Sequence, residues 1–284
     1  MRVWCVLVSL VLFSGCSGQA NTAVETVDEL SERPIGVQLW SVRDALAEDF
    51  EGTLRAIAEM GFDGVEFASD YGPYAGDGPG LRTFLDQLGL RASSAHVSFD
   101  MLSAESLPST IEFFRALDVS LLIIGWDPRG WDENQIQSLV SDLNAASKTL
   151  AQAGMQIGYH NHAQEFGGFR GATFWDFIAS NTNDNVVLQM DIGWVVNAGL
   201  SPMTLIDRYP GRIATAHYKV YPRESDTKSP IIGQDGLDWR RLTAKAIEVG
   251  ALEWVVLEQE VYPDGLTSLE SVAASKRGID AQLE

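Results

Sequence analysis

The sequence has almost no cysteine: Cys5 and Cys16 are the only two in 284 residues, and both lie in the first sixteen. Everything after them therefore lacks a thiol for disulfide bonds, zinc–thiolate sites or nucleophilic catalysis. Basic residues are also scarce, because 20 lysines and arginines stand against 39 aspartates and glutamates, a net charge of -19. Binding to nucleic acid depends on lysine and arginine, so this charge argues against a nucleic-acid partner.

Glycine-rich loops of the dinucleotide-binding or phosphate-binding kind are absent after the apolar segments that we interpret as strands. The apolar run near the start is too short to cross a membrane as a helix. With Arg2 before it and small residues after it, this run predicts an export signal over residues 1–15. The ending "LFSGC" resembles a bacterial lipobox, which predicts cleavage before Cys16 and lipidation of that cysteine, whereas plain secretion without a lipid is the alternative.

Residues 16–33 are polar and unpatterned, and they predict a flexible tether between the lipid and a folded domain. We therefore expect an exported lipoprotein anchored to a membrane, in the periplasm or at the outer membrane if the source is a diderm bacterium. The sequence leaves open which membrane holds the lipid and whether the chain forms a homo-oligomer.

From residue 34 onward, short apolar runs alternate with amphipathic stretches that have apolar residues at helical spacing. The eight expected strands are residues 34–40, 64–68, 91–97, 121–126, 155–161, 185–193, 213–220 and 252–259. The expected helices are residues 49–61, 80–89, 107–118, 132–154, 173–180, 202–211, 238–250 and 267–279. Eight strand–helix repeats predict an α/β fold, a single-domain (β/α)8 TIM barrel over residues 34–284.

Polar side chains gather where the expected strands end, which is where catalytic groups lie in this architecture. All four histidines, His96, His160, His162 and His217, are at or just after the ends of the third, fifth and seventh expected strands. Acidic residues, a lysine and tryptophans are also found at or near strand ends: Glu66, Asp191, Lys219, Glu258, Glu260, Trp40, Trp126 and Trp194. Carboxylates and imidazoles without cysteine suit one divalent metal ion, such as Mn²⁺, Mg²⁺, Co²⁺ or Zn²⁺.

The motifs "IGVQLWSVRD", "GFDGVEFA", "YHNHAQEF", "MDIGWVVNAG", "AHYKVY", "IGQDGLDW" and "VVLEQE" occur in the order of the predicted barrel. Together they resemble the sugar phosphate isomerase/epimerase family of the xylose isomerase-like barrels, which includes ketose 3-epimerases and inosose dehydratases. The resemblance covers roughly residues 34 to 270 and implies one divalent metal held by side chains from strands five to eight. It implies Asp191, His217 and Glu258 as three of the ligands.

The fourth ligand is where the chain departs from the epimerase pattern, which has a glutamate inside strand five. The corresponding stretch reads "GYHNH", and the nearest glutamate is Glu165, in the loop that follows. Either Glu165 turns inward as the fourth ligand, which we favour, or a strand-five histidine takes its place. Alternation along a strand would turn His160 and His162 toward the same side.

The resemblance implies an enzyme that removes a proton next to the carbonyl of a keto-sugar, keto-glycoside or inosose, with isomerisation, epimerisation or β-elimination as the outcome. Glu258 is the expected base, and His160 or His162 the expected acid toward a leaving group. The expected substrate contacts are Gln38, Trp40, Glu66, His96, Trp126, Asp127, Trp194 and Lys219. A phosphorylated substrate is not expected, because the chain has no basic cluster or glycine-rich cradle.

Two other functions remain open from sequence. A carbohydrate-binding lipoprotein without catalysis would keep the aromatic residues and need no metal. The endonuclease branch of the same barrels fits less well, because that chemistry uses more metal ligands and a basic surface.

Overall fold

The computed structural model describes residues 30, 32–221, 229–263 and 265–284. Eight parallel strands close into a barrel in the order β1-β10-β9-β8-β5-β4-β3-β2. Their bounds are β1 Ile35–Gln38, β2 Gly64–Ala68, β3 Arg91–Val97, β4 Leu121–Ile124, β5 Gln156–His160, β8 Val187–Asp191, β9 Thr215–Tyr218 and β10 Trp254–Leu257. The predicted TIM barrel is therefore confirmed.

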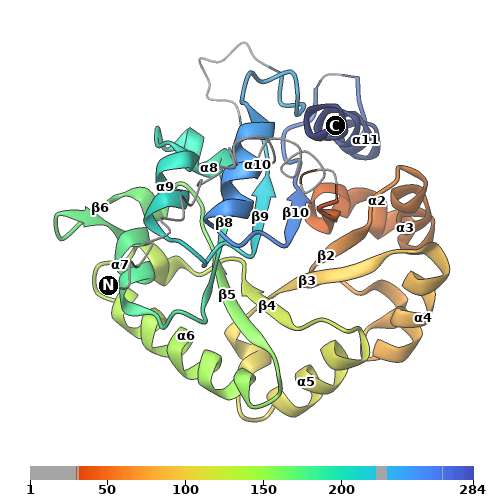
Figure 1. Ribbon diagram of the computed structural model, residues 1–284. Coiled ribbons are helices and arrows are strands. Elements are labelled where there is room, and N and C mark those ends of the chain that lie inside the picture. Colours follow the sequence, from red (N-terminus) through yellow and green to blue (C-terminus); the bar gives the residue numbers. More distant parts are fainter. Residues whose placement is uncertain (1–29, 31, 222–228, 264) are drawn as a thin grey trace, which may run out of the picture.

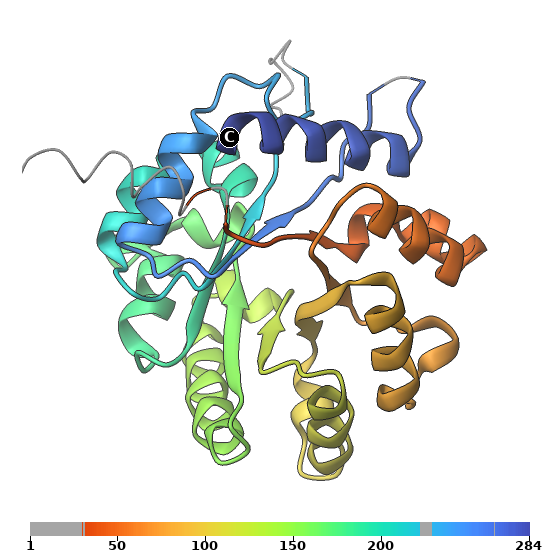
Figure 2. The same cartoon turned by 45° about the vertical axis from the view of Figure 1, so that its right-hand side comes forward.

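The helices form the outer layer around the strands (Figures 1 and 2). They are α2 Arg43–Glu48, α3 Phe50–Glu59, α4 Gly78–Leu88, α5 Leu107–Ala116, α6 Ile136–Ala151, α7 Phe174–Asn181, α8 Ile192–Asn197, α9 Pro202–Arg208, α10 Trp239–Glu248 and α11 Ser268–Leu283. Short 3-10 helices follow the first five barrel strands: η1 Leu39–Val42, η2 Gly72–Tyr74, η3 Phe99–Leu102, η4 Pro128–Trp131 and η5 Gln164–Phe166. A small hairpin, β6 Gly168–Phe169 and β7 Ala172–Thr173, lies between β5 and α7 and was not expected from sequence.

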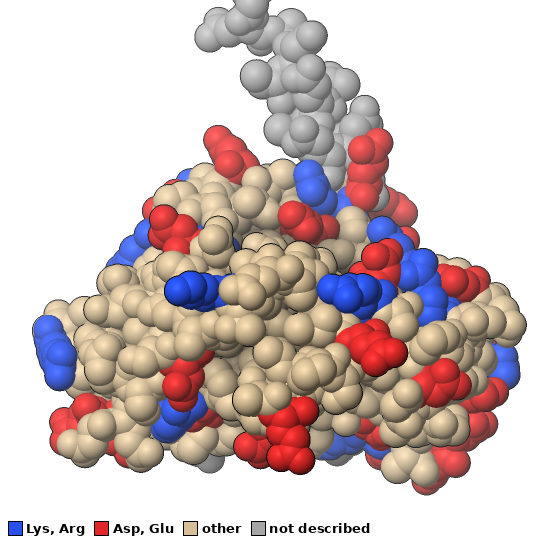
Figure 3. Space-filling model, turned by 90° about the horizontal axis from the view of Figure 1, so that it is seen from below, with Lys and Arg blue, Asp and Glu red and all other residues tan. Residues whose placement is uncertain are grey.

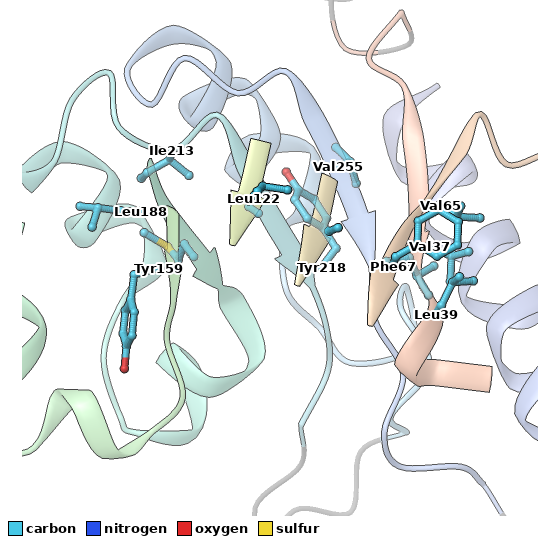
Figure 4. Close-up of a cluster of buried hydrophobic side chains, with 14 of the residues drawn as sticks. Val37, Leu39, Val65, Phe67, Leu122, Tyr159, Leu188, Ile213, Tyr218 and Val255 are labelled. Atoms are coloured by element: carbon cyan, nitrogen blue, oxygen red, sulfur yellow. The ribbon is translucent and has the colours of Figure 1, made fainter. Parts of the chain in front are cut away.

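The main hydrophobic core lies between the strands and the helices. Successive strand residues point to opposite faces, so Val65 and Phe67 of β2 face the helices while Glu66 between them faces the barrel interior. Figure 4 shows members of this core, which come from several strands and the loops next to them: Val37, Leu39, Val65, Phe67, Leu122, Tyr159, Leu188, Ile213, Tyr218 and Val255. The outer face of the barrel is thus apolar all round.

The interior of the barrel has two parts. A small, separate hydrophobic cluster of Leu121, Ile123 and Val187 fills part of it. The rest is polar: Glu66 of β2 accepts a hydrogen bond from Gln189 of β8 at 2.7 Å, although these strands are not neighbours in the sheet. This bond therefore crosses the barrel, and a buried polar network occupies the space beneath the C-terminal ends of the strands.

Helix α7 begins at a capping box in which Thr173 and Asp176 each accept a hydrogen bond from the other residue's backbone. The Asp176 carboxylate also receives hydrogen bonds from Arg208 and Tyr209. Partial burial would raise the pKa of Asp176, but hydrogen bonds from Thr173, Tyr209 and Arg208 outweigh it and lower the pKa to about 2.

This carboxylate gives a prediction about stability and pH. Its pKa is lower in the folded protein than the value of about 3.9 in an unfolded chain, so it stabilises the fold above about pH 4 and loses that effect as the pH falls toward the folded value. We expect Asp176→Asn to lower the free energy of unfolding by roughly 1–2 kcal/mol at pH 7, measured by urea denaturation. The difference from wild type should shrink at pH 3, and an equal difference at both pH values would contradict a role for the charge.

The predicted signal, Cys16 and nearly all of the predicted tether lie outside the described residues. Within the part of the chain that is described, no helix has the length and apolar character needed to cross a membrane. On the face shown in Figure 3, basic and acidic side chains are scattered and do not form a continuous basic patch.

Candidate metal centre

Four side chains meet at the C-terminal end of the barrel and form the candidate metal centre. His160 ends β5, Asp191 ends β8, His217 lies in β9, and Glu258 follows β10 directly. Each offers one ligand atom, these atoms all lie within 4.8 Å of one another, and all four residues are buried. Two imidazoles and two carboxylates are a donor set that divalent metals accept, so the residues present fit such an ion.

Local structure fixes Asp191 in this group. It is the N-cap of α8, and its Oδ1 accepts the Trp194 backbone N–H at 2.8 Å, which leaves Oδ2 toward the other ligands. The following turn needs glycine, because a Cβ on Gly193 would lie 2.8 Å from the backbone oxygen of Lys219. Asn161, after β5, accepts the Asp191 N–H at 3.0 Å and so ties the ends of β5 and β8 together.

Glu66 of β2 holds His217 from the barrel interior. Its Oε1 is bonded to Nε2 of His217, while Nδ1 of the same ring lies 3.0 Å from Glu258 Oε2 and 4.0 Å from Asp191 Oδ2. An imidazole whose Nε2–H is held by a carboxylate presents Nδ1 as its ligand atom, which is the arrangement that orients metal-binding histidines in proteins. Burial would raise the pKa of Glu66, but His96 and His217 lower it well below its usual range.

The centre is strongly acidic. Lys219 is 1% exposed, and its ammonium group pairs with Asp191 and Glu258 at 3.1 Å each and with Glu260. With neutral imidazoles, this one ammonium group cannot balance the carboxylates of Glu66, Asp191, Glu258 and Glu260. Burial would lower the pKa of His217, yet the Glu66 and Glu258 carboxylates raise it to about 10, which shows how strongly the centre attracts positive charge.

The centre opens into a cleft of about 650 Å³, within the range of small-molecule sites. Its wall includes Trp40, His96, Trp126, His160, His162, Trp194, Glu258 and Glu260. Two of the tryptophans are exposed, Trp40 at 45% and Trp126 at 57% of the residue surface. Flat apolar rings beside buried carboxylates are suited to a sugar, which has apolar C–H faces and polar hydroxyl edges.

Two polar atoms in this cleft wall have no hydrogen-bond partner among the described residues. They are Nδ1 of His162 and the indole Nε1 of Trp194, and both are buried. The His162 ring packs edge-on against Trp126, with ring centroids 4.6 Å apart, and 4.9 Å from His160. Burial of a polar atom without a hydrogen-bond partner costs free energy, so these two atoms are exceptions to the usual pairing of buried polar groups.

Glu165 does not join the centre, so the placement that we favoured from sequence is wrong. The η5 turn directs its carboxylate to the outer side of β5, where Oε1 accepts the Tyr159 hydroxyl at 2.9 Å and Oε2 accepts the His162 N–H at 2.9 Å. Among the described residues, two groups of side chains lie close enough together to hold a metal: the four named above, and His96, His160 and His217. Neither group includes Glu165. His160, which faces inward, lies beside Asp191, His217 and Glu258 instead. Glu165 fixes the loop that carries His162.

Four of the eight residues expected to contact the substrate line the cleft, and the other four do not. Trp40, His96, Trp126 and Trp194 lie in the cleft wall, whereas Gln38, Glu66, Asp127 and Lys219 do not. Gln38 is fully buried and donates to Glu66 at 2.6 Å, and Lys219 is held by the carboxylates. Asp127 caps η4 and pairs with Arg129 at 2.7 Å, because the turn after β4 directs its side chain away from the cleft.

Sequence reasoning missed Gln189, which is fully buried and hydrogen-bonds Glu66, His96 and His160. The alternation of side chains along a strand could have predicted its position, because Gln189 is two residues before Asp191 and so lies on the same side of β8.

Comparison with known proteins agrees with the barrel fold. The chain matches the model of the xylose isomerase-like TIM barrel family over residues 54–281. The chain belongs to that family. The resemblance predicted from the motifs is thereby confirmed, and the protein is an enzyme of this family.

Individual relatives span nearly the whole chain. An inosose dehydratase of Lacticaseibacillus casei is 24% identical over an alignment that covers 90% of this chain and 97% of that protein. A sugar phosphate isomerase/epimerase from Parabacteroides distasonis has a TM-score of 0.74 and 24% identity, with 88% of this chain and 94% of that chain covered. A xylose isomerase-like TIM barrel protein from Mycobacterium smegmatis, solved with magnesium, has a TM-score of 0.66 and 19% identity, with 89% and 97% covered.

Glu66→Gln tests the support of the centre from the barrel interior. An amide at this position holds the Nε2–H of His217 less strongly than a carboxylate, and loss of such support costs about 10–100-fold in metal affinity. We expect a drop of that size in Co²⁺ affinity, measured by calorimetric titration of metal-free protein. Affinity equal to wild type would show that Glu66 does not orient the ring.

Proposed function

We propose that the protein is a divalent-metal-dependent enzyme that removes a proton next to the carbonyl of a keto-sugar, keto-glycoside or inosose. One observation carries this proposal: the ligand atoms of four buried side chains lie within 4.8 Å of one another at a cleft walled by indole rings. The ligands in this proposal are His160, Asp191, His217 through Nδ1, and Glu258. A divalent metal held there would act as a Lewis acid on the carbonyl oxygen and make the neighbouring C–H bond more acidic.

Glu258 is the proposed base. It belongs to the metal-binding group and also lines the cleft, so its carboxylate reaches both the centre and a bound sugar. Burial would raise the pKa of Glu258, but Lys219 and His217 lower it well below its usual range. The group is therefore ionised at neutral pH and able to accept a proton from carbon.

We propose β-elimination as the outcome, because β5 presents His160 where epimerases have a glutamate to return the proton on the opposite face. In this step the C–H electron pair forms the new double bond, the C–O bond on the next carbon breaks, and the leaving oxygen takes up the proton that Glu258 removed. The similarity to an inosose dehydratase over most of the chain supports a reaction of this class.

His162 is proposed to hold the leaving oxygen by a hydrogen bond. Burial and the charge of Lys219 lower the pKa of His162 to about 3, so its imidazole is neutral at pH 7. We therefore propose a hydrogen bond to the leaving oxygen in place of the proton donation expected from sequence. His162 lines the cleft, and its Nδ1 has no hydrogen-bond partner among the described residues.

The test is incubation of metal-loaded protein with scyllo-inosose, 3-keto-glucose and a 3-keto-glucoside in D₂O. We expect deuterium at the carbon next to the carbonyl, or an unsaturated product, with at least one of these compounds, and no reaction after chelation. Absence of exchange and of product across the panel, with metal bound, would refute the proposal.

We also propose export and lipid anchoring at Cys16, supported by the lipobox-like residues before it. Labelling of cells with a radioactive fatty acid, for wild type and Cys16→Ala, tests this. We expect label in wild type only, and label in neither protein would refute the anchor.

A further inference from the structure

Gln189 of β8 forms hydrogen bonds with two histidines and with the interior carboxylate at once. It is fully buried. Its Oε1 lies 2.8 Å from Nε2 of His96 and 3.0 Å from Nδ1 of His160, and its Nε2 donates to Oε2 of Glu66 at 2.7 Å. The amide therefore connects Glu66 with rings on β3 and β5.

Glu66 fixes the orientation of this amide. If the amide were flipped, its oxygen would lie 2.7 Å from a carboxylate oxygen, with no hydrogen between them. The hydroxyl of Ser94 already donates its hydrogen to the same Oε2, so it cannot relieve that repulsion. The NH₂ group of Gln189 must face Glu66, and its oxygen must face the two histidines.

The fixed amide determines which nitrogen of each ring carries hydrogen. An amide oxygen only accepts hydrogen bonds, so the ring nitrogens that face it carry N–H. For His160 this nitrogen is Nδ1, and the lone pair is then on Nε2, which lies 3.7 Å from Oδ2 of Asp191 in the candidate metal centre. Among the described residues, Gln189 is the only hydrogen-bond partner of the His160 ring.

We propose that Gln189 is a positioning residue that sets the tautomer of His160, so that this ring presents Nε2 as its ligand atom. Glu66 acts directly on His217 and on His96, whose Nε2 lies 3.2 Å from Oε1, and through the Gln189 amide on His160. The tautomer assignment stands on the hydrogen bonds alone. Its consequence for metal binding rests on the proposed function.

The direct test is ¹⁵N NMR of histidine-labelled, metal-free protein at pH 8, which distinguishes the two tautomers of each neutral ring. We expect wild-type His160 as Nδ1–H. Gln189→Leu should lose this preference, whereas Gln189→Glu, which keeps an acceptor toward both rings, should retain it. Ser94→Ala is the matched control, because it removes a hydrogen bond to the same Glu66 oxygen without touching a histidine, and it should leave the tautomers unchanged.

The second readout is Co²⁺ affinity. We expect a loss of about 10–100-fold in Gln189→Leu, the range found when support of a ligating histidine is removed, and a smaller loss in Gln189→Glu. The assignment would be overturned if wild-type His160 were found as Nε2–H, or if its tautomer were unchanged in Gln189→Leu. The wild-type spectrum alone decides the first point, even if the leucine variant does not fold. If the spectrum shows the expected tautomers but the protein binds no metal, the tautomer assignment stands and the proposed function is refuted.

Discussion

Replacing Glu258 with glutamine is expected to lower kcat by about 1,000-fold, because removal of a positioned base costs roughly 100- to 10,000-fold. The carboxylate lies 3.0 Å from Nδ1 of His217, pairs with Lys219 at 3.1 Å and lines the cleft. Glutamine keeps the size and an oxygen that can face a metal, but it cannot accept a proton from carbon. The measurement is the initial rate of product formation with the keto-sugar that reacts in the D₂O test.

The matched control is Glu260→Gln. Glu260 also pairs with Lys219 and lines the cleft, but it lies outside the four-residue group. We expect this variant to keep its metal and to lose far less activity than Glu258→Gln. Equal losses in both variants would mean that the charge around Lys219, and not a base at Glu258, is what the reaction needs.

Replacing His160 with alanine is expected to weaken metal binding by at least about 100-fold, because removing a ligand costs no less than removing its support. His160 is 3% exposed, and its Nε2 lies 3.7 Å from Oδ2 of Asp191. Calorimetric titration of the metal-free protein with Co²⁺ gives the affinity. His160→Glu, which restores the ligand type of the epimerases, should recover part of the loss.

Glu165→Gln distinguishes the two alternatives for the fourth ligand. Glu165 is buried against Tyr159 and the His162 backbone, and burial raises its pKa to about 7. We expect Glu165→Gln to bind metal as wild type does, because its carboxylate faces away from the centre. The reverse result, metal lost in Glu165→Gln and kept in His160→Ala, would contradict the site described here.

The sequence predicted the barrel because its signals are local. Apolar periodicity recurs along the chain, five of the eight expected helices end in glycine, and two expected strands, 64–68 and 91–97, coincide with β2 and β3. The meeting of Asp191, His217 and Glu258 at one end of the barrel was also predictable, since each lies near the end of an apolar run or just after it. To predict the position of such residues, it is enough to locate the ends of the strands.

The misplaced residues depend on turns and on closure of the barrel. Glu165 faces outward because the η5 turn follows β5, and Asp127 faces away from the cleft because it caps η4. The periodicity of apolar residues does not predict either turn. Lys219 and Gln189 are buried by partners on other strands, Glu258 and Glu66, which are far away in the sequence. Contacts across the interior exist only once the eight strands have closed.

The most direct test of the proposed centre is anomalous diffraction from a crystal of the protein loaded with Mn²⁺. The proposal predicts one strong peak at the C-terminal end of the barrel, within bonding distance of His160 Nε2, Asp191, His217 Nδ1 and Glu258. A peak bound by Glu165, or no peak among these four side chains at saturating Mn²⁺, would contradict it.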